Sequence, residues 1–166
     1  MVEMIRVPVE ECRSICIEAY ERNGVVSEIA ASATEQFLLC DLLGIQTHGI
    51  LRLSHYIGRI QAGGVEPSAS ITVHRKTTAL AIVDGGNALG TAVASRATEV
   101  AIEMAREVGV SFVTVKNSNH FGACASFGWT ACENGMILLS GTKGSLTMPA
   151  PGGKAQVVGN NPIGFA

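Results

Sequence analysis

The spacing of apolar residues changes near residue 65, and this change constrains the fold more than any other feature of the sequence. Before it, apolar residues recur at helical intervals in segments that each end at glycine. These segments, expected to be helices, span residues 8–24, 27–44 and 49–64, with Ser27 as the N-cap of the second. Short connections between them indicate a small bundle, so we expect a helical domain over residues 1–64.

After residue 65, segments with strand composition alternate with helical ones. The expected strands span residues 70–76, 79–85, 111–117, 136–142 and 155–159, with the opening of a further strand in 160–166, and the expected helices span 90–109 and 122–135. Residues 84–90 and 148–154 have the glycine, asparagine or proline content of loops. This order predicts an α/β fold, so residues 65–166 are expected to form part of an α/β domain that follows the helical bundle.

Composition and charge argue against several kinds of partner. The net charge is −2 and no basic cluster occurs, which argues against nucleic acid. No apolar run approaches the roughly 18 residues of a membrane-spanning helix. The N-terminus lacks the layout of a signal peptide and the five cysteines include no CxxC pair, so we expect a reducing, cytoplasmic environment. Apolar residues make up 47% and charged residues 16%, which favours apolar surface covered by a second subunit.

The segment "GIQTHGILRL", residues 44–53, is the first candidate site. His48 follows Thr47 in an expected corner between two helices, and Arg52 stands four positions later. If residues 48–52 are helical, His48 and Arg52 lie on one face. A histidine exchanges a proton near neutral pH, and an arginine binds a carboxylate through two parallel hydrogen bonds. The alternative is a histidine that caps a helix beside a solvated arginine.

The segment "NSNHFG" is the second candidate site. Asn117, Asn119 and His120 follow an expected strand and precede an expected helix. Ligands of α/β proteins bind at the carboxyl ends of strands, and a helix N-terminus offers N–H groups to an anion. The alternative is a turn closed by hydrogen bonds of the asparagines, in which His120 only caps a helix.

Other arrangements are less favoured. His120 and Cys124 are four positions apart and His48 could join them, but zinc needs three or four ligands and carboxylates are scarce here, so no metal site is expected. A nucleophilic pair of Cys124 and His120 is disfavoured because small apolar residues surround the cysteine. Residues 85–90, "GGNALG", lack the Lys-Ser/Thr of a P-loop, and no GxGxxG occurs, so a Rossmann dinucleotide site is not supported.

Several further residues have simpler expected positions. His55 and His74 are expected at the surface, Asp84 in a turn and Trp129 in the core. Lys143 and Lys154 flank the loop over residues 148–154, where each is either solvated or faces a phosphate.

Six segments, in this order and spacing, carry a family resemblance: "GIQTHGILRL..Y", "VDGGNALG", "VKNSNHFGA", "ENGMILLSGT", "PAPGGK" and "GNNPIGFA". Through them the chain resembles the malate/L-lactate dehydrogenase family of NAD(P)-dependent oxidoreductases, which is unrelated to the Rossmann-type enzymes of the same name. Ureidoglycolate and sulfolactate dehydrogenases and diketogulonate reductase belong to it. The resemblance implies a helical bundle joined to an α/β nucleotide-binding domain that is not of the Rossmann type.

The resemblance also implies roles for residues. The catalytic residues implied are His48 and His120, of which either one is the acid–base group, and the substrate-binding residues expected are Arg52, Thr47 and Asn119. The residues implied in binding NAD or NADP are Asn117, Lys143, Gly144, Asn160, Asn161 and Pro162. Lys143 stands where the family usually has asparagine, which is a departure from the pattern at the cofactor.

The function implied is hydride transfer between NAD(P) and a small 2-hydroxy or 2-oxo acid, in a homodimer with the site near the subunit interface. Family members are about twice this long, so the chain is expected to correspond to their N-terminal half, with a C-terminal half missing. The alternative is a truncated, catalytically inactive half that acts as a dimerisation or interaction module.

Overall fold

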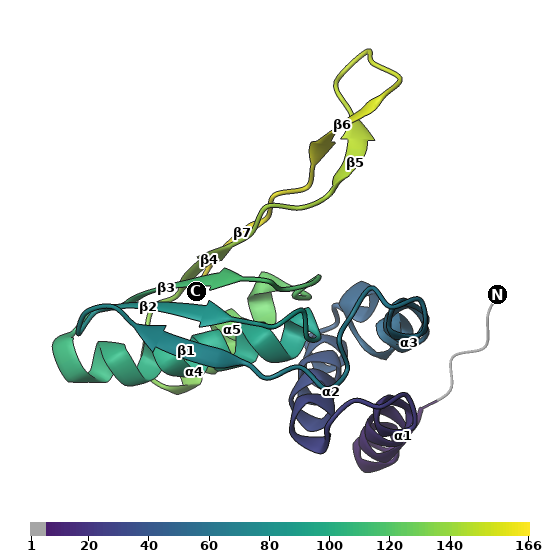
Figure 1. Ribbon diagram of the computed structural model, residues 1–166, viewed down its shortest axis with the longest axis horizontal. Helices are drawn as coiled ribbons and strands as arrows, with labels where there is room; N and C mark the ends of the chain where they lie inside the picture. The colour runs from purple at the N-terminus through teal and green to yellow at the C-terminus, as the bar shows by residue number, and fades with distance from the viewer. Residues whose placement is uncertain (1–5) are drawn as a thin grey trace. The chain divides into compact units, whose positions relative to one another are not determined.

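The computed structural model describes residues 6–166, so the first five residues of the expected helical domain lie outside the described part. The expected helices appear as α1 (Val9–Glu21), α2 (Ser27–Leu42) and α3 (Leu53–Gln61) (Figure 1). The predicted glycine endings of α1 and α2 are confirmed, because Gly24 and Gly44 have φ of +82° and +76°, which glycine adopts at little cost. None of the helices between residues 6 and 166 combines the length and the apolar character that crossing a membrane requires.

The described chain divides into two compact units. The first extends to Ala123, and the second spans Cys124–Ala166. The domains expected from the sequence, residues 1–64 and 65–166, divide the chain at another place, and that division stays a prediction.

Two predicted details of the helices are wrong. Ser27 is the first residue of α2 and not its N-cap. Its hydroxyl donates a hydrogen bond to the carboxylate of Glu21, at the end of α1, at a distance of 2.5 Å. The third helix does not begin at residue 49. Gly49 has φ −88° and ψ −152°, which interrupts the helical path and separates two short 3-10 turns, η1 (Gln46–His48) and η2 (Ile50–Arg52).

A three-stranded sheet follows the helices in the first unit. β1 (Thr72–Arg75) pairs antiparallel with β2 (Leu80–Asp84), and β2 pairs parallel with β3 (Phe112–Lys116). The parallel strands are joined by α4 (Gly90–Val108), which confirms the predicted strand–helix–strand order. Because β2 and β3 run in the same direction and end in register, the segments that follow them emerge at one edge of the sheet.

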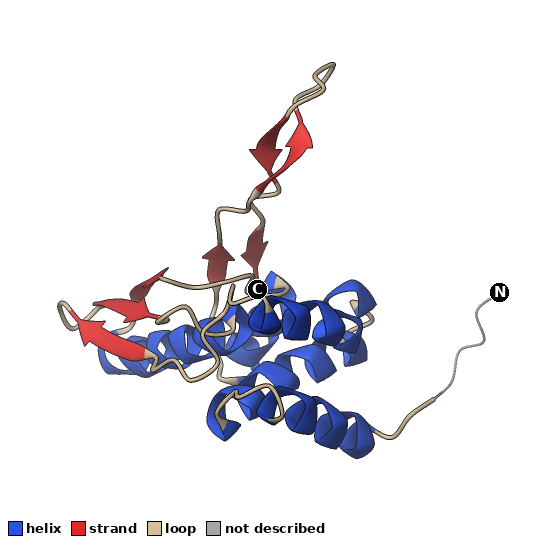
Figure 2. Ribbon diagram, turned by 45° about the vertical axis from the view of Figure 1, so that its right-hand side comes forward, coloured by secondary structure: helices blue, strands red, loops and turns tan. Residues whose placement is uncertain are grey.

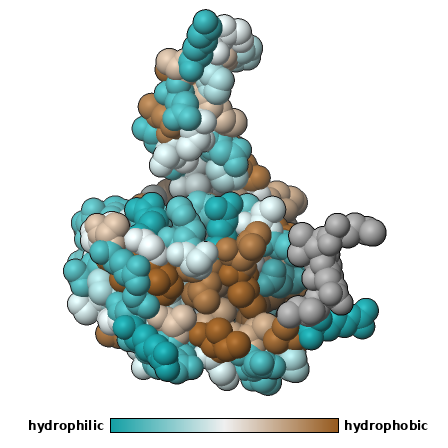
Figure 3. All heavy atoms as spheres, turned by 90° about the vertical axis from the view of Figure 1, so that its right-hand side faces the viewer, coloured by the Kyte–Doolittle hydropathy of each residue, from teal (hydrophilic) through white to brown (hydrophobic). Residues whose placement is uncertain are grey.

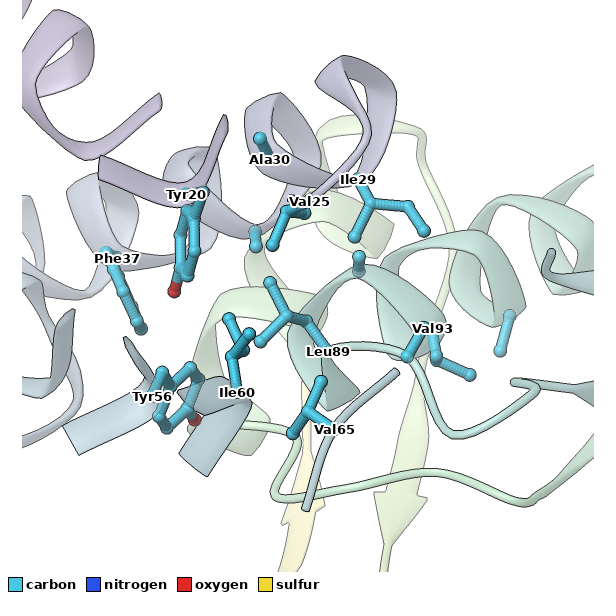
Figure 4. Packing of buried hydrophobic residues seen from close by; sticks show 14 of the residues in the cluster. Tyr20, Val25, Ile29, Ala30, Phe37, Tyr56, Ile60, Val65, Leu89 and Val93 are labelled. Atoms are coloured by element: carbon cyan, nitrogen blue, oxygen red, sulfur yellow. The ribbon is translucent and has the colours of Figure 1, made fainter. Parts of the chain in front are cut away.

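One apolar core joins the helices to α4 within the first unit (Figure 4). Tyr20, Phe37 and Tyr56 come from α1, α2 and α3, and the ring centroid of Phe37 lies 6.3 Å from that of Tyr20 and 5.2 Å from that of Tyr56. Leu89 and Val93 reach the same cluster from the start of α4, and none of the five is more than 4% exposed. Aromatic packing therefore joins α1, α2 and α3, and the start of α4 lies in the same apolar cluster.

The second unit contains one helix and two separate two-stranded ladders, drawn in red in Figure 2. Its elements are α5 (Cys124–Glu133), β4 (Leu139–Gly141) paired antiparallel with β7 (Ile163–Phe165), and β5 (Leu146–Pro149) paired antiparallel with β6 (Gln156–Gly159). The strands predicted near β4, β6 and β7 are confirmed. β5 was not predicted, because the loop expected over 148–154 covers half of it.

Trp129 is exposed, so its predicted core position is wrong. Phe127 and Ala131, four positions apart on α5, are 2% and 1% exposed and form the covered side of the helix. Trp129 lies midway between them in the sequence and so on the opposite side, with 47% of its surface exposed. The surface positions predicted for His55 and His74 are confirmed.

Large apolar side chains are exposed in both units. In the second unit, the residues with 57% to 80% of their surface exposed are Ile137, Leu139, Leu146, Ile163 and Phe165. In the first unit, Leu42 and Leu51 are exposed, and Figure 3 shows apolar residues gathered in one area of the face that it draws. A two-stranded ladder is only marginally stable by itself in water, so the ladders of the second unit would gain stability from a covering surface.

Replacement of Phe37 by alanine tests the aromatic core. Phe37 is fully buried against two tyrosine rings, so Phe37→Ala should lower the free energy of unfolding by about 3–5 kcal/mol in urea denaturation followed by circular dichroism. Leu51→Ala is the control: this side chain is 75% exposed, and its loss should change the free energy by less than about 0.5 kcal/mol. Equal effects of the two substitutions would contradict the described core.

Candidate active site

The corner between α2 and α3 holds His48. Asp41, near the end of α2, accepts a hydrogen bond from the backbone N–H of Ile50 at 2.9 Å. The same carboxylate packs so closely on Gly49 that a Cβ at this position would collide with it. Thr47 Oγ1 lies 3.0 Å from His48 Nδ1. The corner is thus fixed by a side chain of the preceding helix, and the Nδ1 side of the imidazole faces Thr47.

Arg52 lies near His48, but not through the helical face that the sequence predicts. Residues 48–52 belong to two 3-10 turns and not to one helix, because Gly49 leaves the helical conformation. The Nε of Arg52 donates to the backbone O of Thr47 at 2.6 Å, and its terminal nitrogens have no acceptor among residues 6–166. These nitrogens can therefore offer two parallel N–H groups to a carboxylate.

The asparagines of "NSNHFG" are held by hydrogen bonds within the first unit. Asn117, with φ of +50°, donates from Nδ2 to Asp84 Oδ1 at 3.0 Å. Asp84, expected in a turn, is the last residue of β2, and its Oδ1 also accepts from the N–H of Gly86 just after the strand. Asn119 donates from Nδ2 to Asn87 Oδ1 and to Ala88 O, both at 2.9 Å. These hydrogen bonds join the segment after β3 to the segment after β2. The asparagines therefore help to close the turn, as the alternative to a ligand site predicts.

Helix α4 begins directly against this turn. Gly90 is its first residue, and a Cβ there would collide with the backbone carbonyl oxygens of Asn119 and His120. Gly122, just after His120, has φ +90°, and a Cβ there would lie 3.3 Å from Thr91. Glycine at both positions therefore allows the His120 segment to lie directly on the start of α4.

His48 and His120 lie next to each other. Their rings are stacked, with centroids 5.7 Å apart and planes inclined by 22°. The predicted convergence of the two histidines is confirmed, whereas their roles stay predictions. We call these two rings the imidazole pair.

Both rings of the imidazole pair favour the neutral state. Burial lowers the pKa of His48, and the charge of Arg52 lowers it further. His120 keeps an exposed side, but burial of the rest of the ring is the main cause of its lowered pKa, followed by the charges of His48, Arg52, His55 and Arg59. Because a proton on one ring disfavours a proton on the other, the pair takes up its protons one at a time.

Tyr56 and Arg59 of α3 complete the site, and neither was predicted to belong to it. Tyr56 Oη lies 2.6 Å from His120 Nδ1, and Arg59 donates to Asn119 Oδ1 at 3.0 Å. A signal was present in the sequence, because Tyr56 and Arg59 follow Arg52 by four and seven positions, which is the spacing of one side of a helix. Tyr56 also fits the apolar pattern of α3, which hides its polar contact.

A small pocket opens where these side chains meet. Its lining residues are Tyr56, Arg59, Val65, Leu89, Gly90, Asn119 and His120. An imidazole, a phenol, a guanidinium and an amide thus border an apolar floor, the mixture that small-molecule sites present, although a bound acid would extend beyond so small a hollow. Within residues 6–166, no three side chains of His, Cys, Asp or Glu lie together as metal ligands would.

Five of the predicted cofactor residues lie in the second unit. The N–H of Gly144 donates to Asn161 Oδ1 at 2.9 Å, and a Cβ on Gly144 would lie 3.2 Å from the backbone N of Asn160. The segment of Lys143 therefore lies alongside the segment that ends at Pro162. Lys143 and Asn160 are exposed, and their side chains have no hydrogen-bond partner in the described chain. The sixth predicted cofactor residue belongs to the first unit.

The chain belongs to the malate/L-lactate dehydrogenase family, whose sequence profile matches residues 7–166. The malate dehydrogenase of Pyrococcus abyssi is 33% identical over 162 residues, which are 98% of this chain and 45% of that protein. The L-sulfolactate dehydrogenase of Methanocaldococcus jannaschii is 34% identical over 163 residues, which are 98% of this chain and 47% of that protein. The chain thus spans about half the length of the curated relatives that it matches.

The solved structures agree with this assignment. The malate dehydrogenase from Pyrococcus horikoshii OT3 superposes with a TM-score of 0.87 at 34% identity, over 97% of this chain and 46% of that chain. The predicted family and the predicted fold, a helical N-terminal region followed by α/β structure, are confirmed.

Alanine at Gly90 tests the contact between α4 and the turn that carries His120. Because a Cβ there would meet two backbone oxygens, which cannot rotate away, Gly90→Ala should destabilise the chain by about 1–3 kcal/mol in urea denaturation. The matched control is Gly58→Ala, inside α3, where a Cβ meets open space. That substitution should stabilise the chain by up to about 1 kcal/mol. Destabilisation by both to the same extent would contradict the described packing.

Lowering the pH should destabilise the chain through the imidazole pair. Folding lowers the pKa of His48 and His120, so below the ordinary histidine pKa of 6.5 the unfolded chain binds protons that the folded chain does not. The stability that the pair contributes is complete above 6.5 and is lost as the pH falls through the lower folded values. Urea denaturation between about pH 8 and about pH 5 measures this loss.

Two variants separate the pair from other titrating groups. The double variant His48→Gln/His120→Gln should lose part of the pH dependence, whereas His74→Gln, the same change at an exposed residue of β1, should keep it. An unchanged pH dependence in the double variant would show that other groups cause it.

Proposed function

We propose that this chain supplies the acid–base and carboxylate-binding groups of an oxidoreductase that transfers a hydride between NAD(P) and a small 2-hydroxy or 2-oxo acid. The observation that carries the proposal is the imidazole pair, with His48 and His120 stacked 5.7 Å apart and Arg52 close enough for its charge to act on both. Family membership and the similarity to proteins named as malate and L-sulfolactate dehydrogenases support it.

The imidazole pair suits the proton step of this reaction. Oxidation of a 2-hydroxy acid removes a hydride from carbon and a proton from the hydroxyl oxygen. A neutral imidazole accepts that proton, and it returns the proton when the 2-oxo acid is reduced. In both His48 and His120 the Nδ1 atom faces a hydroxyl of the protein, so the Nε2 atom is the one left for substrate.

Arg52 suits the substrate carboxylate. Its Nε is already bonded to Thr47 O, which orients the guanidinium and leaves the terminal nitrogens for a bidentate contact. We also propose two further substrate contacts: Thr47, whose Oγ1 lies 3.0 Å from His48 Nδ1, and Asn119, which lines the pocket. Asn119 also holds the guanidinium of Arg59, so it brings a second positive charge toward a bound acid.

The residues proposed to hold NAD(P) are Asn117, Lys143, Gly144, Asn160, Asn161 and Pro162. The groups present fit such a cofactor in kind, because Lys143 and Asn160 are exposed and offer a cation and an amide to phosphate, ribose or carboxamide groups. When bound, the nicotinamide supplies the hydride acceptor or donor. The protein side chains bind, orient and exchange the proton.

The exposed apolar residues of the second unit favour a second candidate function. Residues such as Ile163 and Phe165 are 80% and 76% exposed. A second copy of the chain would cover such surface. The alternative function is therefore a dimerisation or interaction module without catalysis, and in either case we propose a homodimer.

Cofactor titration separates the two functions. Nicotinamide fluorescence should change when the purified chain is mixed with NADH or NADPH, and pyruvate, oxaloacetate or sulfopyruvate should then be reduced at the expense of the cofactor. His120→Gln should lower kcat by about 10²–10⁴ because the proton acceptor is lost. His74→Gln, at an exposed histidine of β1, should leave kcat unchanged. No cofactor signal from a chain that sediments as a stable dimer would support the module instead.

A further inference from the structure

Tyr56 joins the apolar core to the imidazole pair. Its ring is 4% exposed and packs on Phe37 with centroids 5.2 Å apart (Figure 4). The same ring meets His120 edge-on, with centroids 6.0 Å apart and planes inclined by 78°. The phenol is therefore held by the core, and it presents its hydroxyl to the imidazole from a fixed position.

The hydroxyl of Tyr56 has two partners on His120. Oη lies 2.6 Å from Nδ1 and 3.3 Å from the backbone O of the same residue. A phenol has one proton to donate and oxygen lone pairs that accept. The backbone O accepts the phenol proton, so Oη accepts a hydrogen bond from Nδ1–H at the same time. This arrangement serves both the neutral ring that carries its proton on Nδ1 and the protonated ring.

The two hydrogen bonds are the same in both states of the ring. Nδ1, Oη and the backbone O therefore keep their partners when His120 gains or loses a proton, and the lone pair of the neutral ring is on Nε2. Burial raises the pKa of Tyr56 to about 12, so the phenol keeps its own proton through this change. The proton that His120 exchanges with a ligand therefore enters and leaves at Nε2.

We propose that Tyr56 is a positioning residue that accepts a hydrogen bond from Nδ1–H of His120 in both protonation states, fixes the neutral ring as the Nδ1–H tautomer and directs proton exchange to Nε2. The use of that proton in hydride transfer rests on the proposed function. The tautomer and its cause rest on the geometry alone.

The charged and titratable groups near His120 set the conditions of a test. They are His48 of η1, Arg52 of η2, and His55 and Arg59 of α3. Because two are histidines, a titration must follow His120 itself and not the total charge.

Long-range ¹H–¹⁵N correlation spectra of the chain labelled with ¹⁵N-histidine report both ring nitrogens of His120 across the pH range. In the parent chain, neutral His120 should carry its proton on Nδ1. In Tyr56→Phe, the ratio of Nδ1–H to Nε2–H tautomer should fall about fivefold, the change that one neutral hydrogen bond of about 1 kcal/mol produces. The pKa of His120 should also fall in this variant. The hydrogen bond from the protonated ring to Tyr56 is charge-assisted and therefore stronger than the bond from the neutral ring, so its loss destabilises the protonated form more.

Tyr20→Phe is the matched control. Tyr20 is a buried tyrosine of the same cluster and also packs on Phe37, but its hydroxyl has no hydrogen-bond partner among the described residues. It should leave the tautomer and pKa of His120 as in the parent. Equal spectra of His120 in the two variants, or a parent ring protonated on Nε2 when neutral, would overturn the proposal.

These spectra need neither cofactor nor turnover. A chain that never oxidises a 2-hydroxy acid but shows the tautomer change would contradict the proposed function and leave the role of Tyr56 intact. A chain that turns over substrate but shows no such change would support the proposed function and contradict the role of Tyr56.

Discussion

The close approach of α4 to the turn after β3 is the constraint on which the site depends. β2 and β3 are parallel, so the segments that follow them leave the same edge of the sheet, and α4 starts between them. Gly90 lets the helix rest on the backbone of Asn119 and His120. Gly49 plays the corresponding part on the other side, where Asp41 packs on it. The position of His48 thus depends on Gly49 and that of His120 on Gly90, and a Cβ at either glycine would collide with its neighbours.

Much of this was accessible from the sequence because it depends on spacing along the chain. Apolar periodicity locates α1, α2 and α4, and the run from β2 through α4 to β3 follows from strand composition on either side of a helix. Both histidines stand in segments with turn residues on each side, and a parallel pair of strands indicates that at least one of them lies at a sheet edge. The family motifs then indicated that the segments of His48 and His120 belong to one site, which apolar periodicity does not indicate.

The remainder depends on contacts that a linear pattern does not encode. The path around Gly49 follows from the Asp41 carboxylate, and Ser27 meets Glu21 instead of capping a helix. Trp129 has the composition of a core residue but lies on the uncovered side of α5. Tyr56 was overlooked because burial and hydrogen bonding meet in one side chain, and an apolar pattern reveals only the first.

The double attachment of Tyr56 has a consequence for how such a site can change over generations. If His120 has the proposed role, selection for a tightly folded protein and selection for proton exchange both act on the ring of Tyr56, because this ring packs on Phe37 and carries the hydroxyl that lies against His120. A substitution of Tyr56 would therefore be opposed both by the loss of stability and by the loss of its contact with His120. New specificities in proteins with this arrangement would therefore be expected to arise at exposed residues of the pocket, such as Arg59, and not at the buried Tyr56.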